Sequence, residues 1–321
     1  MGDALAVSPP AEVEGLQWLA EEALGYAAAS RSVRTQEAYA ADWAHFEAWA
    51  AARGLQPLPA EPATLVLYLT DLARTYRPST ITRRMASISV AHQTKGLPSP
   101  TADPRVRAVS RGIRRTLGVA PREAAPAVIG EIRRMTFHLP RSAAGTRDRA
   151  LLLVGFASAL RRSELVSLNV ADLDQRDEGL VLHIRRSKTD QEAAGRLTAL
   201  PRGRDLETCP ILALQRWLDL AEISEGALFR AVDRHGNVSD QRLSDRAVSL
   251  VVKRAAEAAG LDASRYSGHS LRAGFATTAA ANGASERAIA NQTGHRSMNV
   301  LRKYVRHGSV FIDNAASMVG L

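Results

Sequence analysis

Two polar pairs in the second half of the chain combine residue types that suit the binding of an anion. Arg161 and Glu164 are three residues apart, so the carboxylate can hold the guanidinium or the following turn in place. His269 and Arg272 have the same spacing, which puts both side chains on one helical face with donors for a single anion. Paired donors of this kind predict a site for a negatively charged group.

Three further polar residues extend this set. Lys188 is one of only four lysines in a chain rich in arginine, and His295 follows a glycine and precedes Tyr304 by nine residues. The spacings of His183, His269 and His295 match no metal-binding motif. The sequence also lacks the glycine-rich nucleotide loops and the GxSxG elbow of serine hydrolases. We therefore expect no metal, ATP or dinucleotide cofactor. Each cluster alone is unspecific, because Arg–Glu pairs are common on surfaces and histidines at helix starts are usually caps or core residues.

The elements expected to position these residues form a mostly helical body with a small sheet at one edge. Residues 150–160 are apolar on every side and predict a buried helix. Residues 180–184 and 196–200 alternate apolar and polar side chains around a polar turn, which predicts a β-hairpin with Lys188 near its tip. Further helices are expected at 162–168, 211–220, 244–259, 270–281, 285–292 and 297–305.

Four amphipathic helices are predicted in the first third of the chain. The first has one apolar stripe made of Tyr39, Trp43, Phe46 and Ala50, and the second opens at Pro62. The third is expected to be capped by Ser79 or Thr80, with the outward side chains Arg83, Arg84 and Ser87. The fourth begins at Asp103 and ends at Gly118, with the buried stripe Val106, Val109, Ile113 and Leu117.

The charge of the chain is uneven. Lysine and arginine outnumber aspartate and glutamate by 42 to 33, giving a net charge of +9 and a pI near 10.2. Residues 74–122 hold eleven basic side chains and one acid, a net of +10. An excess of this size predicts a polyanionic partner, either nucleic acid or an anionic membrane surface. The side chains expected to contact nucleic acid lie on the outer faces of the third and fourth helices: Arg83, Arg84, Arg107, Arg111, Arg114 and Arg115.

Length and composition exclude several classes of protein. A chain of 321 residues suits two domains, and its single cysteine, Cys209, allows no intramolecular disulfide. The longest apolar run, residues 150–160, is shorter than the roughly 20 residues of a membrane span. The N-terminus lacks the basic start of a secretory signal. We expect a cytoplasmic protein, associated with the nucleoid if its polyanionic partner is DNA.

Taken in chain order, these residues resemble one family, the tyrosine site-specific recombinases or phage integrases. The matching motifs are ALRRSEL, RRSKTD, GHSLRAGFAT, TGHRS and VLRKYVR. The first domain, with WAHFEAW and LPSPTADPRVRAVSRGIRR, is similar to the core-binding domain of Cre-like two-domain members. The chain departs from the family at Ala159, where glycine is frequent, and at Ala273-Gly274, where histidine is often found. Neither departure removes a functional group.

The resemblance implies an enzyme that cleaves and rejoins DNA without metal or ATP. Tyr304 would be the nucleophile that forms a 3′-phosphotyrosyl link, and Lys188 would protonate the leaving 5′-oxygen. His269 would either accept the tyrosine proton or hold the phosphate, and both roles stay open. Donors to the non-bridging oxygens would come from Arg161, Arg272 and His295, with Glu164 in support.

The resemblance also implies the partners and the domain organisation. The expected substrate is double-stranded DNA with specific inverted-repeat sites, and four copies of the chain are expected on it, because strand exchange needs two cuts at each of two sites. We expect an acidic, partly disordered segment at 1–30, a helical core DNA-binding domain at 31–117, a linker at 118–127 and the catalytic domain at 128–321. Segment 309–321 is expected to pack on a neighbouring copy, although packing on its own domain stays open.

Three other functions compete with recombination. A type IB topoisomerase would use the same clamp to nick and reseal DNA without exchanging strands. A non-catalytic architectural protein or repressor would need the basic surface but no nucleophile. Binding to a membrane surface is disfavoured, because the basic helices lack an apolar insertion face. Whether an accessory protein is required stays open.

Overall fold

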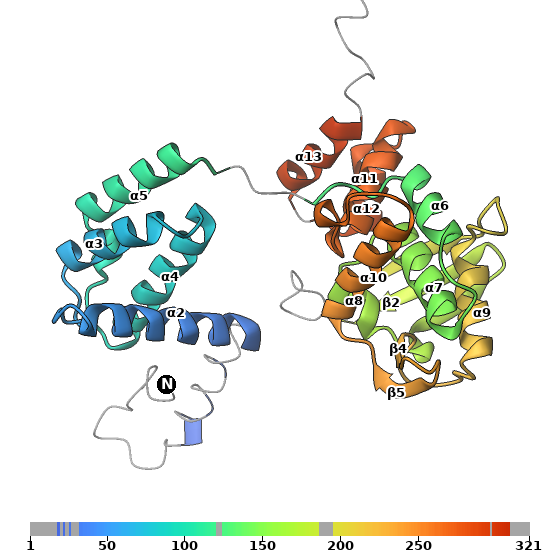
Figure 1. Cartoon of the computed structure of the whole chain (residues 1–321), viewed down its shortest axis with the longest axis horizontal. Coiled ribbons are helices and arrows are strands. Elements are labelled where there is room, and N and C mark those ends of the chain that lie inside the picture. Colours follow the sequence, from blue (N-terminus) through green and yellow to red (C-terminus); the bar gives the residue numbers. More distant parts are fainter. Residues whose placement is uncertain are drawn as a thin grey trace, which may run out of the picture. The chain divides into compact units, whose positions relative to one another are not determined.

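The computed structural model describes residues 18, 19, 22, 26, 32–119, 124–185, 195–295 and 297–308. The chain divides into two compact units between residues 122 and 123, and Figure 1 shows the elements of each. Most of the acidic segment 1–30, part of the linker, Lys188 and segment 309–321 lie outside the described residues. Within the described ranges, no helix is long and apolar enough to cross a membrane.

The described part of unit 1 is a bundle of four α-helices around an aromatic core. Its elements are α2 (Val33–Ala51), α3 (Pro62–Ala73), α4 (Pro78–Thr94), the short 3₁₀ helix η1 (Pro100–Ala102) and α5 (Pro104–Leu117). The apolar stripe predicted on the first helix is confirmed, since Trp43, Phe46 and Ala50 are buried. The ring of Phe46 lies 4.9 Å from that of Tyr68 on α3. The predicted boundaries of α5 are also confirmed, with Asp103 as the N-cap and Gly118 as the C-cap in a left-handed φ of 72°.

Several details predicted for unit 1 are wrong. Helix α4 begins at Pro78 with Arg77 as its N-cap, not at Ser79 or Thr80, because proline suits the first helical position. The side chain of Ser87 is buried and not outward. Leu117 is 47% exposed, because it is the last residue of α5 and no neighbouring element covers it.

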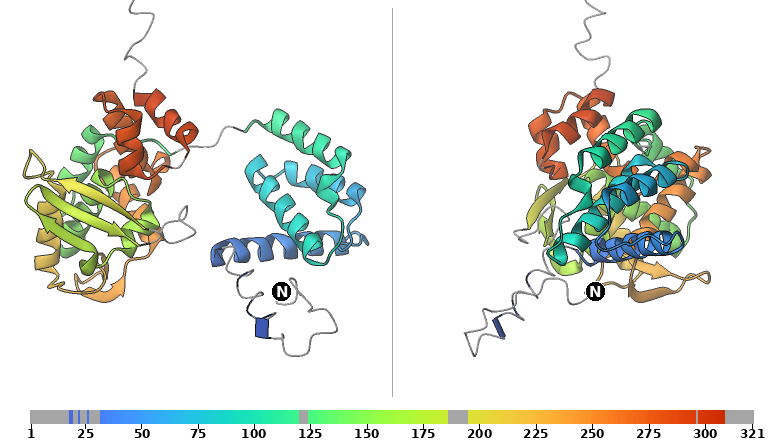
Figure 2. Two further views of the ribbon diagram at one scale, coloured as in Figure 1. Left: turned by 180° about the vertical axis from the view of Figure 1, so that it is seen from behind. Right: turned by 90° about the vertical axis from the view of Figure 1, so that its left-hand side faces the viewer.

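Unit 2 is mainly helical, with two small antiparallel sheets among its described residues. Its elements in chain order are α6 (Ile129–Phe137), α7 (Ala143–Ala157), α8 (Arg162–Ser167), η2 (Val170–Asp172), β1 (Leu173–Arg176), β2 (Gly179–Ile184), β3 (Arg196–Pro201), α9 (Pro210–Leu220), β4 (Arg230–Val232), β5 (Val238–Arg242), α10 (Asp245–Ala258), η3 (Ala263–Arg265), α11 (His269–Ala281), α12 (Glu286–Thr293) and α13 (Met298–Gly308). The predicted hairpin is confirmed as β2 and β3, to which β1 adds an edge strand in the order β1-β2-β3 (Figure 2). Sequence reasoning missed α6, β1 and the β4–β5 pair.

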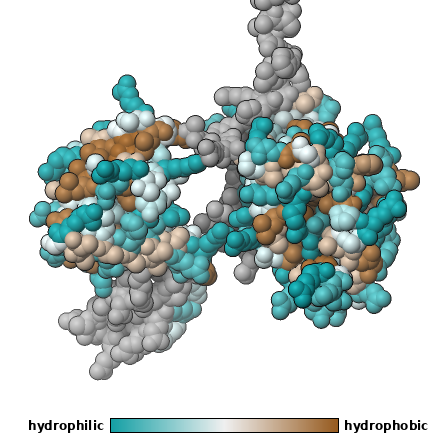
Figure 3. Space-filling view, viewed as in Figure 1, coloured by the Kyte–Doolittle hydropathy of each residue, from teal (hydrophilic) through white to brown (hydrophobic). Residues whose placement is uncertain are grey.

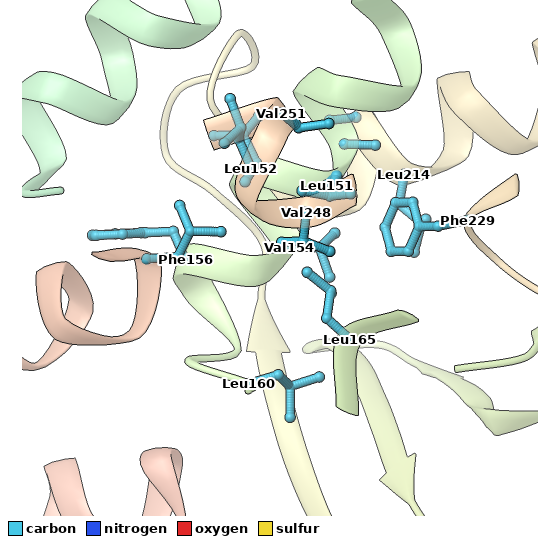
Figure 4. Close-up of a cluster of buried hydrophobic side chains, with 14 of the residues drawn as sticks. Leu151, Leu152, Val154, Phe156, Leu160, Leu165, Leu214, Phe229, Val248 and Val251 are labelled. Carbon is cyan, nitrogen blue, oxygen red and sulfur yellow. The ribbon is translucent and has the colours of Figure 1, made fainter. Parts of the chain in front are cut away.

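Helix α7 is the centre of the core of unit 2. All its residues from Ala150 to Phe156 are buried, as predicted, and Figure 4 shows Leu151, Leu152 and Val154 packed among side chains of α8, α9 and α10. The helix ends at Ala157 and not at Leu160, because Ala159 has a left-handed φ of 51°. This turn directs the chain into α8 and so determines where Arg161 lies.

On the face seen in Figure 3, hydrophilic residues surround several patches of hydrophobic ones in each unit. Some large apolar side chains are exposed, including Leu67 on α3 and Phe137 at the end of α6. Scattered exposure of this kind is normal for folded proteins and carries no functional conclusion.

Candidate active site

Arg161 and Glu164 are joined by two hydrogen bonds at the start of α8. The backbone N–H of Arg161 donates to Oε2 of Glu164 at 3.0 Å, and its Nη1 donates to Oε1 at 2.5 Å. The carboxylate is 2% exposed, so it is a buried negative charge held by hydrogen bonds. The carboxylate of Glu164 therefore has both of the roles expected from its position three residues after Arg161: it holds the guanidinium and caps the turn.

A second arginine, which sequence reasoning missed, shares this carboxylate. Nη2 of Arg196, at the first position of β3, lies 3.3 Å from Oε2 of Glu164. Its Nη1 donates to Thr198 and to the carbonyl of Gln292 near the end of α12. Glu164 thus joins α8 to β3. The only signal for Arg196 in the sequence was its position, at the start of a predicted strand and shortly after Lys188.

Arg272 is buried in the middle of the site. It is 1% exposed, and its Nη1 donates to the carbonyl oxygens of Ala159 and Thr293, the first at 2.9 Å. Burial, followed by the positive charge of Arg161, lowers the pKa of Arg272 to about 10, so the side chain stays charged at neutral pH. Its Nη2 is buried and has no hydrogen-bond partner among the described residues. A charged donor left over at this depth suits an anion that enters the site.

His269 and Tyr304 meet across the contact between α11 and α13. Nε2 of His269 lies 2.8 Å from the hydroxyl oxygen of Tyr304. Helix α13 lies beside α11 and α12 in Figure 1 and packs on them through Leu301, which is fully buried with Ala276 and Ile289. This small apolar cluster holds the tyrosine against the start of α11.

His295 lies between the end of α12 and α13. It follows Gly294, whose left-handed φ of 65° ends α12. Its Nδ1 lies 2.7 Å from Oγ1 of Thr293, and its ring centroid is 6.1 Å from that of Tyr304. Burial, followed by the positive charge of Arg272, lowers the pKa of His295 to about 3, so its imidazole is neutral at physiological pH.

The structure brings most of the sequence-predicted site residues into one cluster. The charge of Arg272 acts on His295, and that of Arg161 acts on Arg272. Lys188 lies outside the described residues. No group of three or more His, Cys, Asp or Glu residues is arranged to hold a metal within the described part of unit 2 or of unit 1.

The predicted nucleic-acid surface is only partly as expected. The four arginines of α5 that were expected to contact nucleic acid are exposed: Arg107, Arg111, Arg114 and Arg115. Arg83 is half-exposed, with Nε and Nη2 donating to the buried carboxylate of Asp42 at 2.7 and 3.0 Å. The outward direction predicted for Arg84 is wrong. Arg84 is 7% exposed and lies 4.1 Å over the ring of Tyr76, because α2 and α3 cover this face of α4.

An apolar groove of about 800 Å³ lies beside the site. Its walls come from the sheet and from α7, α11 and α12, and they include Phe156, Leu200, Phe275 and Ile289. Gln292 also lines the groove and donates to the carbonyl oxygens of Ala157 and Ala199, which ties α12 to α7 and β3. The groove therefore borders elements that carry Arg196 and Arg272.

Comparison with known proteins gives consistent matches. The model of the phage integrase family matches residues 130–309. An integrase/recombinase xerD homolog of Selenomonas ruminantium is 38% identical over 290 residues, which cover 89% of this chain and 85% of the relative. Recombinase cre of Escherichia phage P1 is 28% identical over 282 residues, 81% of this chain and 80% of the relative.

Solved structures show the same fold. XerH recombinase bound to palindromic difH DNA in a post-cleavage complex aligns with a TM-score of 0.61 at 18% identity, covering 80% of this chain and 72% of XerH. A lambda integrase tetramer bound to a Holliday junction aligns with a TM-score of 0.58 at 17% identity, covering 91% of this chain and 77% of the integrase.

Proposed function

Since the chain belongs to the phage integrase family and is a tyrosine recombinase, an enzyme that cleaves and rejoins DNA at specific sites, we propose that Tyr304 is its nucleophile. The observation that carries this assignment is the 2.8 Å contact between Nε2 of His269 and the hydroxyl of Tyr304. A neutral imidazole at this distance can accept the hydroxyl hydrogen as the oxygen attacks phosphorus. Of the two roles that the sequence left open for His269, the geometry favours proton acceptance.

The proposed step exchanges one phosphodiester bond for another. The Tyr304 oxygen bonds to phosphorus, the bond to the 5′-oxygen of the DNA breaks, and the phosphate is left as a 3′-phosphotyrosyl ester. The leaving oxygen needs a proton, and Lys188 is proposed to supply it, as the family motif implies. Because an ester is conserved, the reverse attack by a 5′-hydroxyl can rejoin the strand without ATP.

Two guanidinium groups are proposed to stabilise the charge on the phosphate. Arg272 has a buried Nη2 with no partner among the described residues, and Arg161 keeps donors beyond the two that Glu164 binds. Charge on the non-bridging oxygens rises in the transition state, and fixed donors there cost no reorganisation. His295 is placed beside Tyr304 and is proposed as a further contact to the phosphate.

DNA and further copies of this chain are the proposed partners. DNA-bound relatives, including the lambda integrase tetramer, support both. We propose that the exposed arginines of α5 contact the phosphate backbone, that the target sites contain inverted repeats, and that four copies assemble on two sites. Segment 309–321 is proposed to pack on a neighbouring copy, and the apolar groove offers a surface of suitable character.

Adduct formation on nicked suicide duplexes tests the assignment of Tyr304. Duplexes tiling the DNA that flanks the gene would be mixed with purified protein in EDTA and resolved under denaturing conditions. The expected result is a covalent adduct that disappears in Tyr304→Phe. An adduct that persists in this variant would show that another residue is the nucleophile, and binding without any adduct would contradict metal-free cleavage by the chain alone.

A further inference from the structure

Thr293 contacts two of the proposed catalytic groups at once. It is the last residue of α12 and is fully buried. Its backbone carbonyl accepts a hydrogen bond from Nη1 of Arg272, and its hydroxyl oxygen lies 2.7 Å from Nδ1 of His295. The same hydroxyl lies 2.7 Å from the carbonyl oxygen of Ile289, one helical turn earlier. Sequence reasoning did not single out this threonine.

The position of the hydroxyl hydrogen follows from these two short contacts. A threonine hydroxyl has one hydrogen and two lone pairs, while a carbonyl oxygen can only accept. Two oxygens at 2.7 Å with no hydrogen between them repel each other, so the hydrogen lies toward Ile289, as it does when a threonine bonds back to its own helix. The contact with His295 must then be made by a lone pair of Thr293, and Nδ1 of His295 must be the donor.

This assignment decides the tautomer of the histidine. In a neutral imidazole one nitrogen carries the hydrogen and the other is an acceptor. The ring is neutral because it is buried among positive charges, of which Arg272 is the strongest. With Nδ1 protonated, Nε2 carries no hydrogen, and no described residue hydrogen-bonds to it.

We propose that Thr293 is a positioning residue that fixes His295 as the Nδ1–H tautomer and leaves Nε2 as a proton acceptor in the active site beside Tyr304. The inference rests on the proposed site. It revises the role expected from the sequence, because His295 can donate from Nε2 to a phosphate oxygen only after that atom has taken a proton. The carbonyl of Thr293 also holds Arg272, so one residue aligns both groups through different atoms.

The tautomer can be measured without DNA. Protein labelled with ¹⁵N-histidine would be studied near neutral pH by long-range ¹H–¹⁵N correlation, with the His295 signals identified by their loss in His295→Gln. We expect Nδ1 to be protonated in the wild type and in Thr293→Ser, which keeps the hydroxyl. Thr293→Val has nearly the same shape without the hydroxyl, and we expect it to lose this preference. A wild-type His295 protonated at Nε2 would overturn the proposal.

Cleavage tests the functional consequence. In single-turnover reactions on the suicide duplex, Thr293→Val is expected to slow adduct formation by roughly tenfold or more, the usual effect of losing a group that orients a reacting residue. Thr293→Ser should stay within about twofold, and DNA binding should be unchanged in both. A Thr293→Val protein that cleaves at the wild-type rate contradicts the positioning role, whichever tautomer it shows. An adduct that persists in Tyr304→Phe would instead refute the assigned nucleophile. The inference on Thr293 would then still be decided by the tautomer of His295 in the wild-type protein.

Discussion

Nε2 of His269 lies 2.8 Å from the hydroxyl oxygen of Tyr304, although the two residues are 35 positions apart in the sequence. Helix α11 presents the histidine from its first residue, and α13 returns the tyrosine to it through the buried contact of Leu301. The pair is thus formed by helix packing, and the chemistry of the site depends on that packing being maintained.

Replacing His269 with alanine is expected to slow adduct formation by about 10²-fold or more, because a positioned general base contributes roughly 10²–10⁴-fold. DNA binding should be unaffected, since the side chain of His269 is exposed and its replacement leaves the exposed arginines of α5 in place. Single-turnover cleavage on the suicide duplex and a filter-binding assay measure the two quantities. His183→Ala, an exposed histidine on β2, is the matched control and should behave as the wild type.

Replacing Glu164 with glutamine should reduce both stability and cleavage. The buried carboxylate accepts from Arg161 and Arg196, and hydrogen bonds between charged groups are worth about 2 kcal/mol each. We therefore expect the free energy of unfolding in urea to fall by about 2 kcal/mol or more. Asp174→Asn, which breaks the exposed ion pair with Arg176, is the control and should cost less than about 1 kcal/mol. Equal losses in both variants would contradict the role given to Glu164.

The arginines of unit 1 should separate into two classes. Arg111→Gln and Arg114→Gln remove exposed charges from α5, so each should weaken DNA binding and reduce the slope of log K against log salt by about 1. Arg84→Gln should instead lower the stability of unit 1 to urea, because the side chain is buried against Asp42, His45 and Tyr76. Salt titrations of DNA binding and urea unfolding curves measure the two effects. An Arg84→Gln protein with a lower salt slope and unchanged stability would contradict this division.

The pH dependence of stability should carry a contribution from His295. Its pKa is lowered from 6.5 to about 3 in the folded protein, so between these values the unfolded chain binds a proton that the folded protein excludes. The full stability is therefore present above pH 6.5, and the free energy of unfolding falls as the pH decreases toward 3. The slope from one such proton cannot exceed about 1.4 kcal/mol per pH unit. Urea unfolding of the wild type and of His295→Gln across this range measures the difference, and parallel curves would contradict the lowered pKa.

Deleting residues 309–321 is expected to lower recombination far more than binding of a single copy of the protein. The segment is apolar at helical spacing, and packing of each copy on the next would couple the subunits of a closed ring. Recombination of a two-site plasmid and gel-shift binding to one half-site measure the two effects. A deletion of similar length from the acidic N-terminus is the control. Equal recombination by the protein without 309–321 would refute packing in trans.

Much of the fold and of the candidate site could be predicted because the signals are local. Alternating residues predicted the β2–β3 hairpin, and Asp103-Pro104 and Gly118 marked both ends of α5. The ordered motifs around Arg161, Arg272 and Tyr304 predicted the family and its chemistry, since residue type and order along the chain suffice for that.

Other features depend on which residues of neighbouring elements lie opposite each side chain. The periodicity of a single helix holds no information on those neighbours. The pattern of α4 placed Arg84 outside, but Tyr76 and the buried Asp42 on other segments enclose it. Glu164 was expected to pair with Arg161, and only the packing of β3 against α8 adds Arg196 as a second partner.

The sequence by itself determined the family, the order of the proposed catalytic residues and the helices that carry His269, Arg272 and Tyr304. Tertiary structure decided which atoms of these residues meet. The tautomer of His295 depends on a hydroxyl that also contacts Ile289, and the basicity of the ring depends on the burial and on the charge of Arg272. Hydrogen positions and pKa values are set by distances between side chains, and folding brings those side chains together from separate segments.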